Sequence, residues 1–382
     1  MNIIQESSTT ISKNTEHRMS DKETNVNNKP KDTNEIDILV KACKAGSTQD
    51  VESYIKQGGN VNLTDKCGFT PIFYATLYKH IEICKLLIDA GANVNQRDKN
   101  GDTPFIYACK VCRVDLAELY INHGANVDIC TSKKETPLII ACLKGHEKLI
   151  DLLYTSQENF IQSTEGWNPL TAACYKGHLS VVAALIKKGV DINKVDGEGR
   201  SPIYTACKYG KNSVVNLLLS KGCDISKTDS SGVTPFMAAC EGGYKNIVES
   251  LVEKGVDINK VDVDDRSPFY MACKYGKSPV VNLLVSKGCD ISNADSNGVT
   301  PFMAACEGGY KDIVENLVEI SLSDIKRADK SGVRPIDIAC RKGHLDICKV
   351  LIVKGIDINE ASKDGWTPLM EAVRDIYQQQ SI

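Results

Sequence analysis

Proline recurs along the chain at nearly constant intervals, and this regularity constrains the fold more than any other feature. Successive members lie 32 to 34 residues apart. A period near 33 is typical of solenoids, in which small units stack in a row instead of surrounding one core. A solenoid offers a long surface and usually no enclosed catalytic cavity, so the period favours binding over catalysis. The prolines are Pro71, Pro104, Pro137, Pro169, Pro202, Pro235, Pro268, Pro301, Pro335 and Pro368.

Residues 201–233 show what one period contains. Ser201 is a good N-cap and Pro202 suits the first turn of a helix. Gly210 breaks this first helix, and aliphatic residues at spacings of three and four predict a second one. Gly222 ends the second helix, and turn residues lead to the next start. The predicted unit is therefore helix, tight turn, helix and hairpin-like loop, and neighbours must stack to bury its apolar face.

Short motifs return at fixed positions of this period. They include Gly68-Phe69-Thr70-Pro71, Gly91-Ala92-Asn93-Val94-Asn95, Thr136-Pro137-Leu138, Gly145-His146, Gly177-His178, Gly343-His344 and Gly355-Ile356-Asp357-Ile358-Asn359. From about Ile36 to the C-terminus, the chain resembles the ankyrin repeat family. The resemblance implies an all-α fold, an α-solenoid of about eleven stacked ankyrin-type helix-turn-helix repeats with hairpin-like loops.

The sequence departs from the family pattern at one position. The family has a histidine after Thr-Pro-Leu, and no repeat of this chain has it. We interpret this as divergence of sequence and not loss of the fold, so the polar bonds of that histidine must be replaced or lost. The position holds Phe73, Ile106, Ile139, Thr171, Tyr204, Met237, Tyr270, Met303, Asp337 and Met370.

Composition and repeat boundaries predict the domain organisation. Residues 1–35 are rich in Asn, Thr, Ser and Lys and are predicted to be a disordered tail, either a tether or a solvated extension. Residues 36–382 form the repeat domain, and residues 36–66 are its N-terminal cap because they lack the Thr-Pro start. Residues 191–322 are a duplicated two-repeat block whose halves are identical at fifty of sixty-six positions. Residues 367–382 are a truncated final unit, either a cap or the result of a truncated sequence.

Two irregular junctions interrupt the array. Gln157 to Ile161 replace the usual Gly-containing segment, and Ser321 replaces a helix-ending Gly. Arg334 then stands where other repeats have an N-cap Thr. Because a helix end without Gly loses its easiest left-handed residue, we expect local bends or weaker coupling at both junctions.

The sixteen cysteines follow the repeat and do not form a disulfide or metal set. Most share one position of the first helix, and stacked helices lie about 8–10 Å apart, too far for bridges between equivalents. We therefore predict reduced packing cysteines and no cofactor or metal; the Cys109-x-x-Cys112 spacing has no partner pair. His80, His146, His178 and His344 also share one repeat position and are predicted to be structural. The shared cysteines are Cys43, Cys109, Cys142, Cys174, Cys207, Cys240, Cys273, Cys306 and Cys340.

Composition excludes several classes of function. The net charge of −3 gives no basic stripe for nucleic acid, and no apolar run is long enough for a membrane span. The first residues lack a secretory signal, so the cytosol is expected, with the nucleus as the alternative. No phosphate loop, nucleophile elbow or zinc-protease motif is present, so no enzyme activity is predicted. A monomer is expected.

The resemblance places partner binding on the concave side, formed by hairpin tips and first helices. Tyr and Arg are favoured interface anchors, and the duplication repeats such residues along this side. We predict a groove for an acidic or extended protein segment; the alternative is that duplication alone copied these residues. The predicted partner-binding residues are Trp167, Tyr175, Arg200, Lys208, Tyr209, Arg266, Lys274 and Tyr275.

The predicted function is a non-catalytic protein-protein interaction module, an adaptor or scaffold with a protein partner of unknown identity. Two alternatives stay open at this point. One is a regulatory inhibitor of a bound enzyme, and the other is a structural or mechanical solenoid element without a single dedicated partner.

Overall fold

The computed structural model describes residues 31–154, 163–363 and 365–379. Over these residues, helices alternate with turns and no residue belongs to a β-strand. The prediction of an all-α repeat fold is confirmed. The chain divides into two compact units, residues 1–99 and 100–382, and each is described by itself.

The first unit contains two repeats. Repeat 1 pairs α2 (Lys31–Ala45) with α3 (Thr48–Lys56), and repeat 2 pairs α4 (Pro71–Leu77) with α5 (Ile81–Asp89). α2 packs on α4 and α3 packs on α5, so each helix of one repeat meets its equivalent in the next. Their shared core is fully buried and includes Cys43, Val51, Ile72, Cys84 and Leu87.

Helix α2 begins at Lys31, so the predicted tail is wrong for residues 31–35. These five residues contain neither glycine nor proline, and Asp32 and Glu35 suit the first turn of a helix. The first helix of repeat 1 therefore begins five residues before Ile36, where the predicted repeat domain starts. The rest of the predicted tail, residues 1–30, lies outside the described residues.

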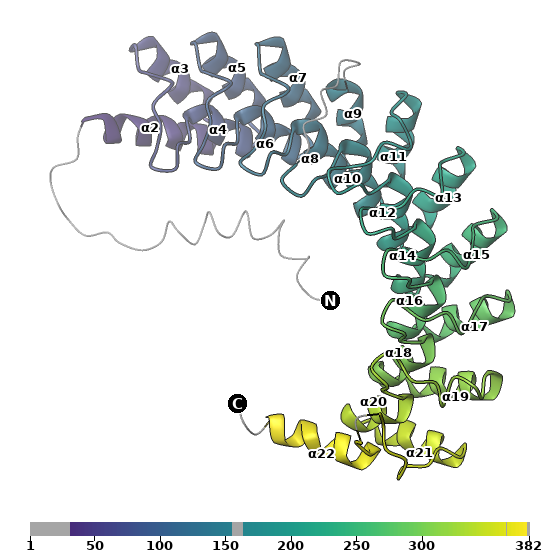
Figure 1. Cartoon of the computed structure of the whole chain (residues 1–382). Helices are drawn as coiled ribbons and strands as arrows, with labels where there is room; N and C mark the ends of the chain where they lie inside the picture. The colour runs from purple at the N-terminus through teal and green to yellow at the C-terminus, as the bar shows by residue number, and fades with distance from the viewer. Residues whose placement is uncertain (1–30, 155–162, 364, 380–382) are drawn as a thin grey trace. The chain divides into compact units, whose positions relative to one another are not determined.

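The second unit continues the pattern through repeats 3 to 11 (Figure 1). Each first helix packs on the first helix of the next repeat, and the second helices form a parallel row. Within this unit the second helices fan apart more than the first helices do, so the first helices lie on the concave side (Figure 1). The first helices are α6 (Pro104–Lys110), α8 (Pro137–Lys144), α10 (Pro169–Lys176), α12 (Pro202–Lys208), α14 (Pro235–Gly242), α16 (Pro268–Lys274), α18 (Pro301–Gly308), α20 (Pro335–Arg341) and α22 (Pro368–Gln379). The second helices are α7 (Val114–Asn122), α9 (Glu147–Leu153), α11 (Leu179–Lys187), α13 (Asn212–Ser220), α15 (Lys245–Glu253), α17 (Ser278–Ser286), α19 (Lys311–Ile320) and α21 (Leu345–Val353).

Local chemistry explains where the helices begin and end. Ser201 accepts a hydrogen bond from the backbone N–H of Tyr204, as an N-cap should. Gly145 ends α8 at φ 78°, and a side chain there would meet His178, whose Nδ1 lies 2.7 Å from the place of a Cβ. Most repeats use glycine at such left-handed positions, but Cys112 and Asp265 adopt φ values of 57° and 61° in their place. These two positions therefore carry backbone strain that their glycine equivalents avoid.

The cysteines of the repeated position are packing residues. All sixteen cysteines are free thiols. Eight of the nine in the shared position are buried, and Cys340 is half-buried. Burial raises the pKa of the Cys109 thiol to about 12 and that of Cys43 to about 12. These thiols therefore stay protonated at neutral pH and behave as small apolar side chains.

The missing histidine is replaced in two ways, and the two alternate along the duplicated block. In repeats 7 and 9, Met237 and Met303 receive the backbone N–H of the N-cap residue on sulfur, at 3.4 and 3.5 Å. In repeats 6 and 8, the hydroxyls of Tyr204 and Tyr270 reach forward and donate to the turn aspartates Asp229 and Asp295 of the next repeat. The duplicated block thus has a structural period of two repeats.

The irregular junctions have local structural causes. The first, Gln157 to Ile161, lies outside the described residues. At the second, α19 runs one residue longer and ends at Ser321 in an extended conformation, without a left-handed residue. Arg334 does not act as an ordinary N-cap, because its N–H, Nε and Nη2 all donate to the buried carboxylate of Asp337. α22 extends to Gln379, within the predicted final unit of residues 367–382.

Candidate functional site

Four of the predicted site residues form one cluster in repeats 5 and 6, which we call the Trp167 cluster: Trp167, Tyr175, Arg200 and Tyr209. The rings of Trp167 and Tyr175 stack with centroids 4.9 Å apart and planes at 12°. Tyr209 meets Tyr175 edge to face at 4.6 Å, and the Arg200 guanidinium carbon lies 4.0 Å from the centre of the Trp167 ring. Hairpin tips supply Trp167 and Arg200, while the ends of α10 and α12 supply the two tyrosines.

Trp167 and Arg200 form the inner half of the Trp167 cluster, which lies beneath the two tyrosines and is not a free surface. Trp167 is 4% exposed, and its indole N–H donates to Glu165 at 2.8 Å. The Arg200 side chain is 11% exposed and pairs with the buried Asp196 at 2.8 Å and with Glu198 at 2.6 Å. Its guanidinium charge is therefore already neutralised inside the hairpin, and it cannot serve as a free anchor for an acidic group.

The outer half of the cluster faces solvent. Tyr175 and Tyr209 are half-buried, and partial burial raises the pKa of Tyr209. The Lys176 ammonium lies 4.6 Å from the centre of the Tyr175 ring, and the exposed Lys208 lies 5.7 Å from that of Tyr204. One ammonium group thus lies over a ring of the Trp167 cluster, and a second lies over Tyr204 of the same repeat as Tyr209.

The second copy of the duplicated block does not form such a cluster. Arg266 pairs with the buried Asp262 at 2.7 Å and with Asp264 at 2.9 Å. The two positions that hold Trp167 and Tyr175 upstream of Arg200 hold Val233 and Glu241 upstream of Arg266. Arg266 and its neighbours thus repeat the residues of the first copy without its stacked rings.

The two remaining predicted residues lie on α16 and just after it. Tyr275 is 42% exposed, and burial raises its pKa, with the charge of Glu241 adding to the effect. The Lys274 ammonium lies 5.8 Å from the centre of the Tyr270 ring. The structure does not bring these residues into the Trp167 cluster, since the first helix α14 lies between α12 and α16.

Lysines mark the ends of three consecutive first helices beside the cluster. Lys144, Lys176 and Lys208 close α8, α10 and α12, and among the described residues no carboxylate lies within ion-pair distance of any of them. The hairpin carboxylates Glu165 and Glu198 are engaged by Trp167 and Arg200. Positive charge in this stretch therefore stays available to a partner.

The position of Lys208, directly after the shared cysteine, alternates in sign further along. The residue after the shared cysteine is Glu241 in repeat 7, Lys274 in repeat 8 and Glu307 in repeat 9. Neighbouring charges of opposite sign partly cancel at distances of about 10 Å in salt solution. Repeats 4 to 6 are thus the more favourable stretch for an acidic segment.

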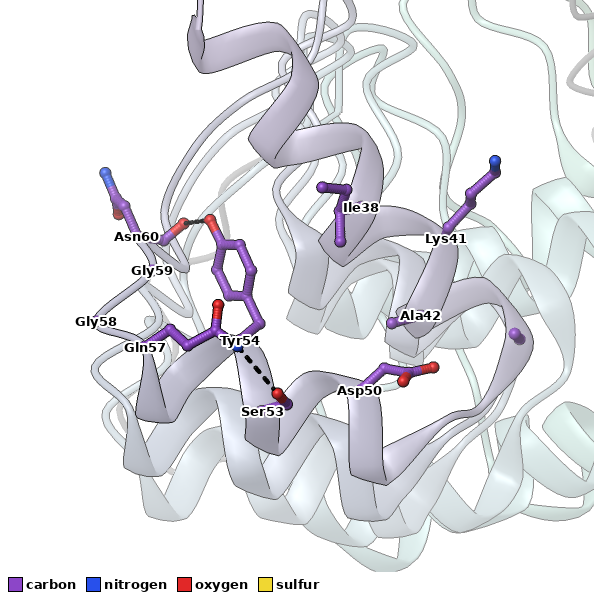
Figure 2. Close-up of a pocket in the computed structure, with 11 residues that line it drawn as sticks. Ile38, Lys41, Ala42, Asp50, Ser53, Tyr54, Gln57, Gly58, Gly59 and Asn60 are labelled. Atoms are coloured by element: carbon purple, nitrogen blue, oxygen red, sulfur yellow. Dashed lines mark hydrogen bonds between the residues drawn. The ribbon is translucent and has the colours of Figure 1, made fainter.

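A second concave feature lies in repeat 1. A hollow of about 830 Å³ opens between α2 and α3, lined by Ile38, Lys41, Asp50, Tyr54 and Asn60 among others (Figure 2). The Tyr54 hydroxyl crosses it to donate to the carbonyl of Asn60 at 3.4 Å. Ile38 is 57% exposed, whereas the equivalent faces of later helices in this unit are covered by the preceding repeat. Over the described residues, the hollow is a stacking face of repeat 1 on which no preceding repeat packs.

The shared histidines have a structural role. In each, Nε2 lies against the end of the preceding first helix and donates to a carbonyl, Lys110 for His146 and Leu143 for His178. Burial lowers the pKa of His146, which favours the neutral ring. Over the residues that the structure describes, no group of three or more His, Cys, Asp and Glu side chains is arranged to hold a metal ion.

A family model for ankyrin repeats matches the chain in overlapping stretches. They run from residues 17–98 through 39–130, 93–161, 112–196, 139–229, 191–262, 236–329 and 269–362 to 319–380. The chain belongs to the ankyrin-repeat family. Ankyrin repeats generally mediate protein-protein interactions and are typically non-catalytic. A search of curated proteins gave no significant match, and no described helix is both long and apolar enough to cross a membrane.

Sequence reasoning left out part of this site. Lys144 and Lys176 were not among the predicted residues, although each ends a first helix of the ankyrin array, as Lys208 does. A comparison of charges at this position in successive repeats could have found them. The ring stacking could not be found in this way, because it depends on which tip residue meets which helix end across a repeat boundary.

Proposed function

We propose that this ankyrin protein is an adaptor that holds an extended acidic segment of a protein partner across the first helices of repeats 4 to 6. The observation that carries the proposal is the Trp167 cluster with Lys144, Lys176 and Lys208 beside it. The rings give a rigid contact surface, and the lysines give charge that no carboxylate of the described residues uses.

Each part of the surface has a distinct role in this proposal. Tyr175 and Tyr209 pack against apolar parts of the segment, which aromatic side chains do at low cost in conformational entropy. Lys176 and Lys208 attract its carboxylates and speed association. Trp167 and Arg200 do not touch the partner; they hold the tyrosines in place from below.

The second copy supplies an auxiliary contact. Arg266, Lys274 and Tyr275 lie two repeats further along, about 20 Å at ordinary helix spacing. A partner segment long enough to span this distance would meet Tyr275 and Lys274 as well. Because Glu241 and Glu307 flank Lys274, we infer a weaker contribution from this copy. The free thiols support a reducing compartment, and we infer the cytosol.

A peptide selection tests this proposal without knowledge of the natural partner. A library of random linear peptides displayed on phage is selected against the full chain, and enriched peptides are synthesised for calorimetry. We expect an enriched motif with several Asp or Glu and at least one apolar residue, and an affinity that falls as salt rises. Enrichment of basic or uncharged peptides, or affinity independent of salt, would contradict the proposed acidic partner.

Two double variants of equal chemistry locate the binding surface. K208A/Y209A removes the outer residues of repeat 6, and K274A/Y275A removes the same residue types from repeat 8. We expect the first to weaken binding of the enriched peptide at least about tenfold and the second by about twofold. Circular dichroism of both variants shows whether each is folded.

A further inference from the structure

Two cysteines of repeat 10 differ from all other cysteines in their surroundings. Cys340 lies in α20 and Cys348 in α21, and their sulfur atoms are 3.5 Å apart. A disulfide bond has a sulfur-sulfur distance of about 2.05 Å, so a small rotation of either side chain would bring the two atoms to bonding distance. The pair lies within one repeat, between its two helices.

This pairing arises because two repeat positions hold cysteine at once. Cys340 occupies the shared first-helix position, and Cys348 occupies the second-helix position that faces it. In repeat 2 the facing pair is Thr76 and Cys84, with only one sulfur atom. The second-helix position in the other described second helices is aliphatic, namely Val51, Ala117, Ile150, Val182, Val215, Val248, Val281 and Val314.

The Cys340–Cys348 pair also differs from the buried thiols in its solvent access and in its thiol pKa. Cys340 is half-buried, whereas Cys306, its equivalent in repeat 9, is fully buried. A hydrogen bond from the Cys340 thiol lowers the pKa of Cys348, because it stabilises the thiolate. Burial instead raises the pKa of Cys109 to about 12. A reagent can thus reach repeat 10, and one of its two sulfur atoms ionises more readily than an ordinary thiol.

We propose that Cys340 and Cys348 are an oxidisable dithiol site, which a small-molecule disulfide converts to an intramolecular disulfide bond. The thiolate of one cysteine attacks a sulfur atom of the reagent, forms a mixed disulfide and releases one thiolate. The other cysteine loses its proton and attacks the protein sulfur of the mixed disulfide, which releases the second thiolate. Two protein thiols are oxidised and one small-molecule disulfide is reduced to two thiols.

The bond would fix a segment that contacts the neighbouring repeat. Between the two cysteines, Lys342 pairs with Glu307 at 3.3 Å and His344 donates to the Glu307 carbonyl at 3.0 Å. Oxidation would tie α20 to α21 on both sides of these contacts. We therefore expect slower amide hydrogen exchange in residues 340–348 of the oxidised protein, by about tenfold or more.

The experiment is oxidation of the folded full chain with glutathione disulfide, followed by alkylation of free thiols and tryptic mass spectrometry. Trypsin does not cut before Pro335, so the two cysteines fall in separate peptides, residues 331–341 and 343–349. We expect these two peptides to be joined by a disulfide, with the loss of two hydrogen atoms. The exposed Cys67 serves as an internal reference for the reagent and should give only a glutathione adduct.

Matched variants keep the outcome decisive if one protein is unstable. C340S and C348S each remove one sulfur atom with little change of volume, and each should abolish the joined peptide while the remaining cysteine accumulates a glutathione adduct. Cys306, which faces Val314, should stay alkylatable only after denaturation. The proposal is overturned if Cys67 reacts with glutathione while Cys340 and Cys348 both remain free thiols, or if Cys340 stops at the mixed disulfide.

Discussion

The two halves of the duplicated block carry the same Arg-Lys-Tyr residues, yet only one of them forms a cluster. Arg200 lies on Trp167, and Tyr209 lies on Tyr175. Arg266 and Tyr275 follow Val233 and Glu241 instead, because the block was copied without the repeat that precedes it. In an ankyrin array a surface is built across the boundary between repeats, so copying a repeat copies its residues but not its site.

Some hydrogen bonds occur in both halves because both residues of each bond lie inside the duplicated block. Tyr204 donates to Asp229, and Tyr270 donates to Asp295. In each pair the aspartate also caps its own turn through backbone N–H groups, so the bond joins two repeats. The comparison thus separates contacts that duplication preserves from contacts that it cannot preserve, and the following variants test that separation.

The largest expected effect is a loss of folding stability when Trp167, in the hairpin tip before α10, is replaced. W167A should lower the free energy of unfolding by about 4 kcal/mol, because it removes a buried indole and leaves a cavity. V233A, the matched change at the second copy, should cost about 2 kcal/mol, since fewer buried carbon atoms are lost. Urea unfolding followed by circular dichroism measures both, and equal losses would show that the cluster adds nothing to the packing.

The tyrosine-aspartate bonds should behave alike in both halves. Y204F and Y270F should each cost about 1.5 kcal/mol, because a charged acceptor loses its donor. Burial and the aspartate raise the pKa of both hydroxyls above 10. The folded state therefore binds these protons more tightly, so this stability is present below pH 10 and is lost as the pH rises above it.

Alkaline unfolding checks this second prediction. Urea unfolding at several pH values above 9 should show that each Phe variant loses less stability than the parent as the pH rises. A Y204F effect more than about twice that of Y270F would mean that the two halves differ inside the block as well as at its upstream edge.

A double substitution in the second copy tests whether the missing upstream residues are sufficient to form a second cluster. V233W/E241Y gives Arg266 and Tyr275 the upstream residues that Arg200 and Tyr209 have. We expect the affinity of an acidic peptide for this chain to rise about fivefold, about 1 kcal/mol, since a second cluster forms and Glu241 is removed. The control E241Q removes the charge alone, and an equal gain from it would show that the rings do not matter.

The smallest expected effect concerns the turn before each arginine. Asp265 adopts φ 61° where the first half has Gly199 at φ 76°. D265G should raise the free energy of unfolding by about 0.5 kcal/mol and G199D should lower it by a similar amount, because a Cβ is disfavoured in this conformation. Calorimetric unfolding of the two variants measures the changes; a loss of stability in D265G would show that the Asp265 side chain makes a compensating contact.

The repeat fold could be predicted from the sequence because its signals are local. Ser201 and Pro202 start a helix, and glycines such as Gly145 end one, wherever the rest of the chain lies. The site could be predicted only in part. Its residue types followed from the repeat, and its side of the array followed from the resemblance to the family. The burial of Trp167 depends on side-chain packing between repeats, and the pairing of Arg200 with Asp196 depends on the conformation of their own hairpin.

The measurement that tests the central claim most directly is the affinity of one acidic peptide for K208A/Y209A and K274A/Y275A, each compared with the parent chain by calorimetry. If the site depends on the neighbours in repeats 5 and 6, the first variant loses at least about tenfold in affinity and the second about twofold. Equal losses in the two variants would contradict the account, because the repeated residues alone would then determine binding.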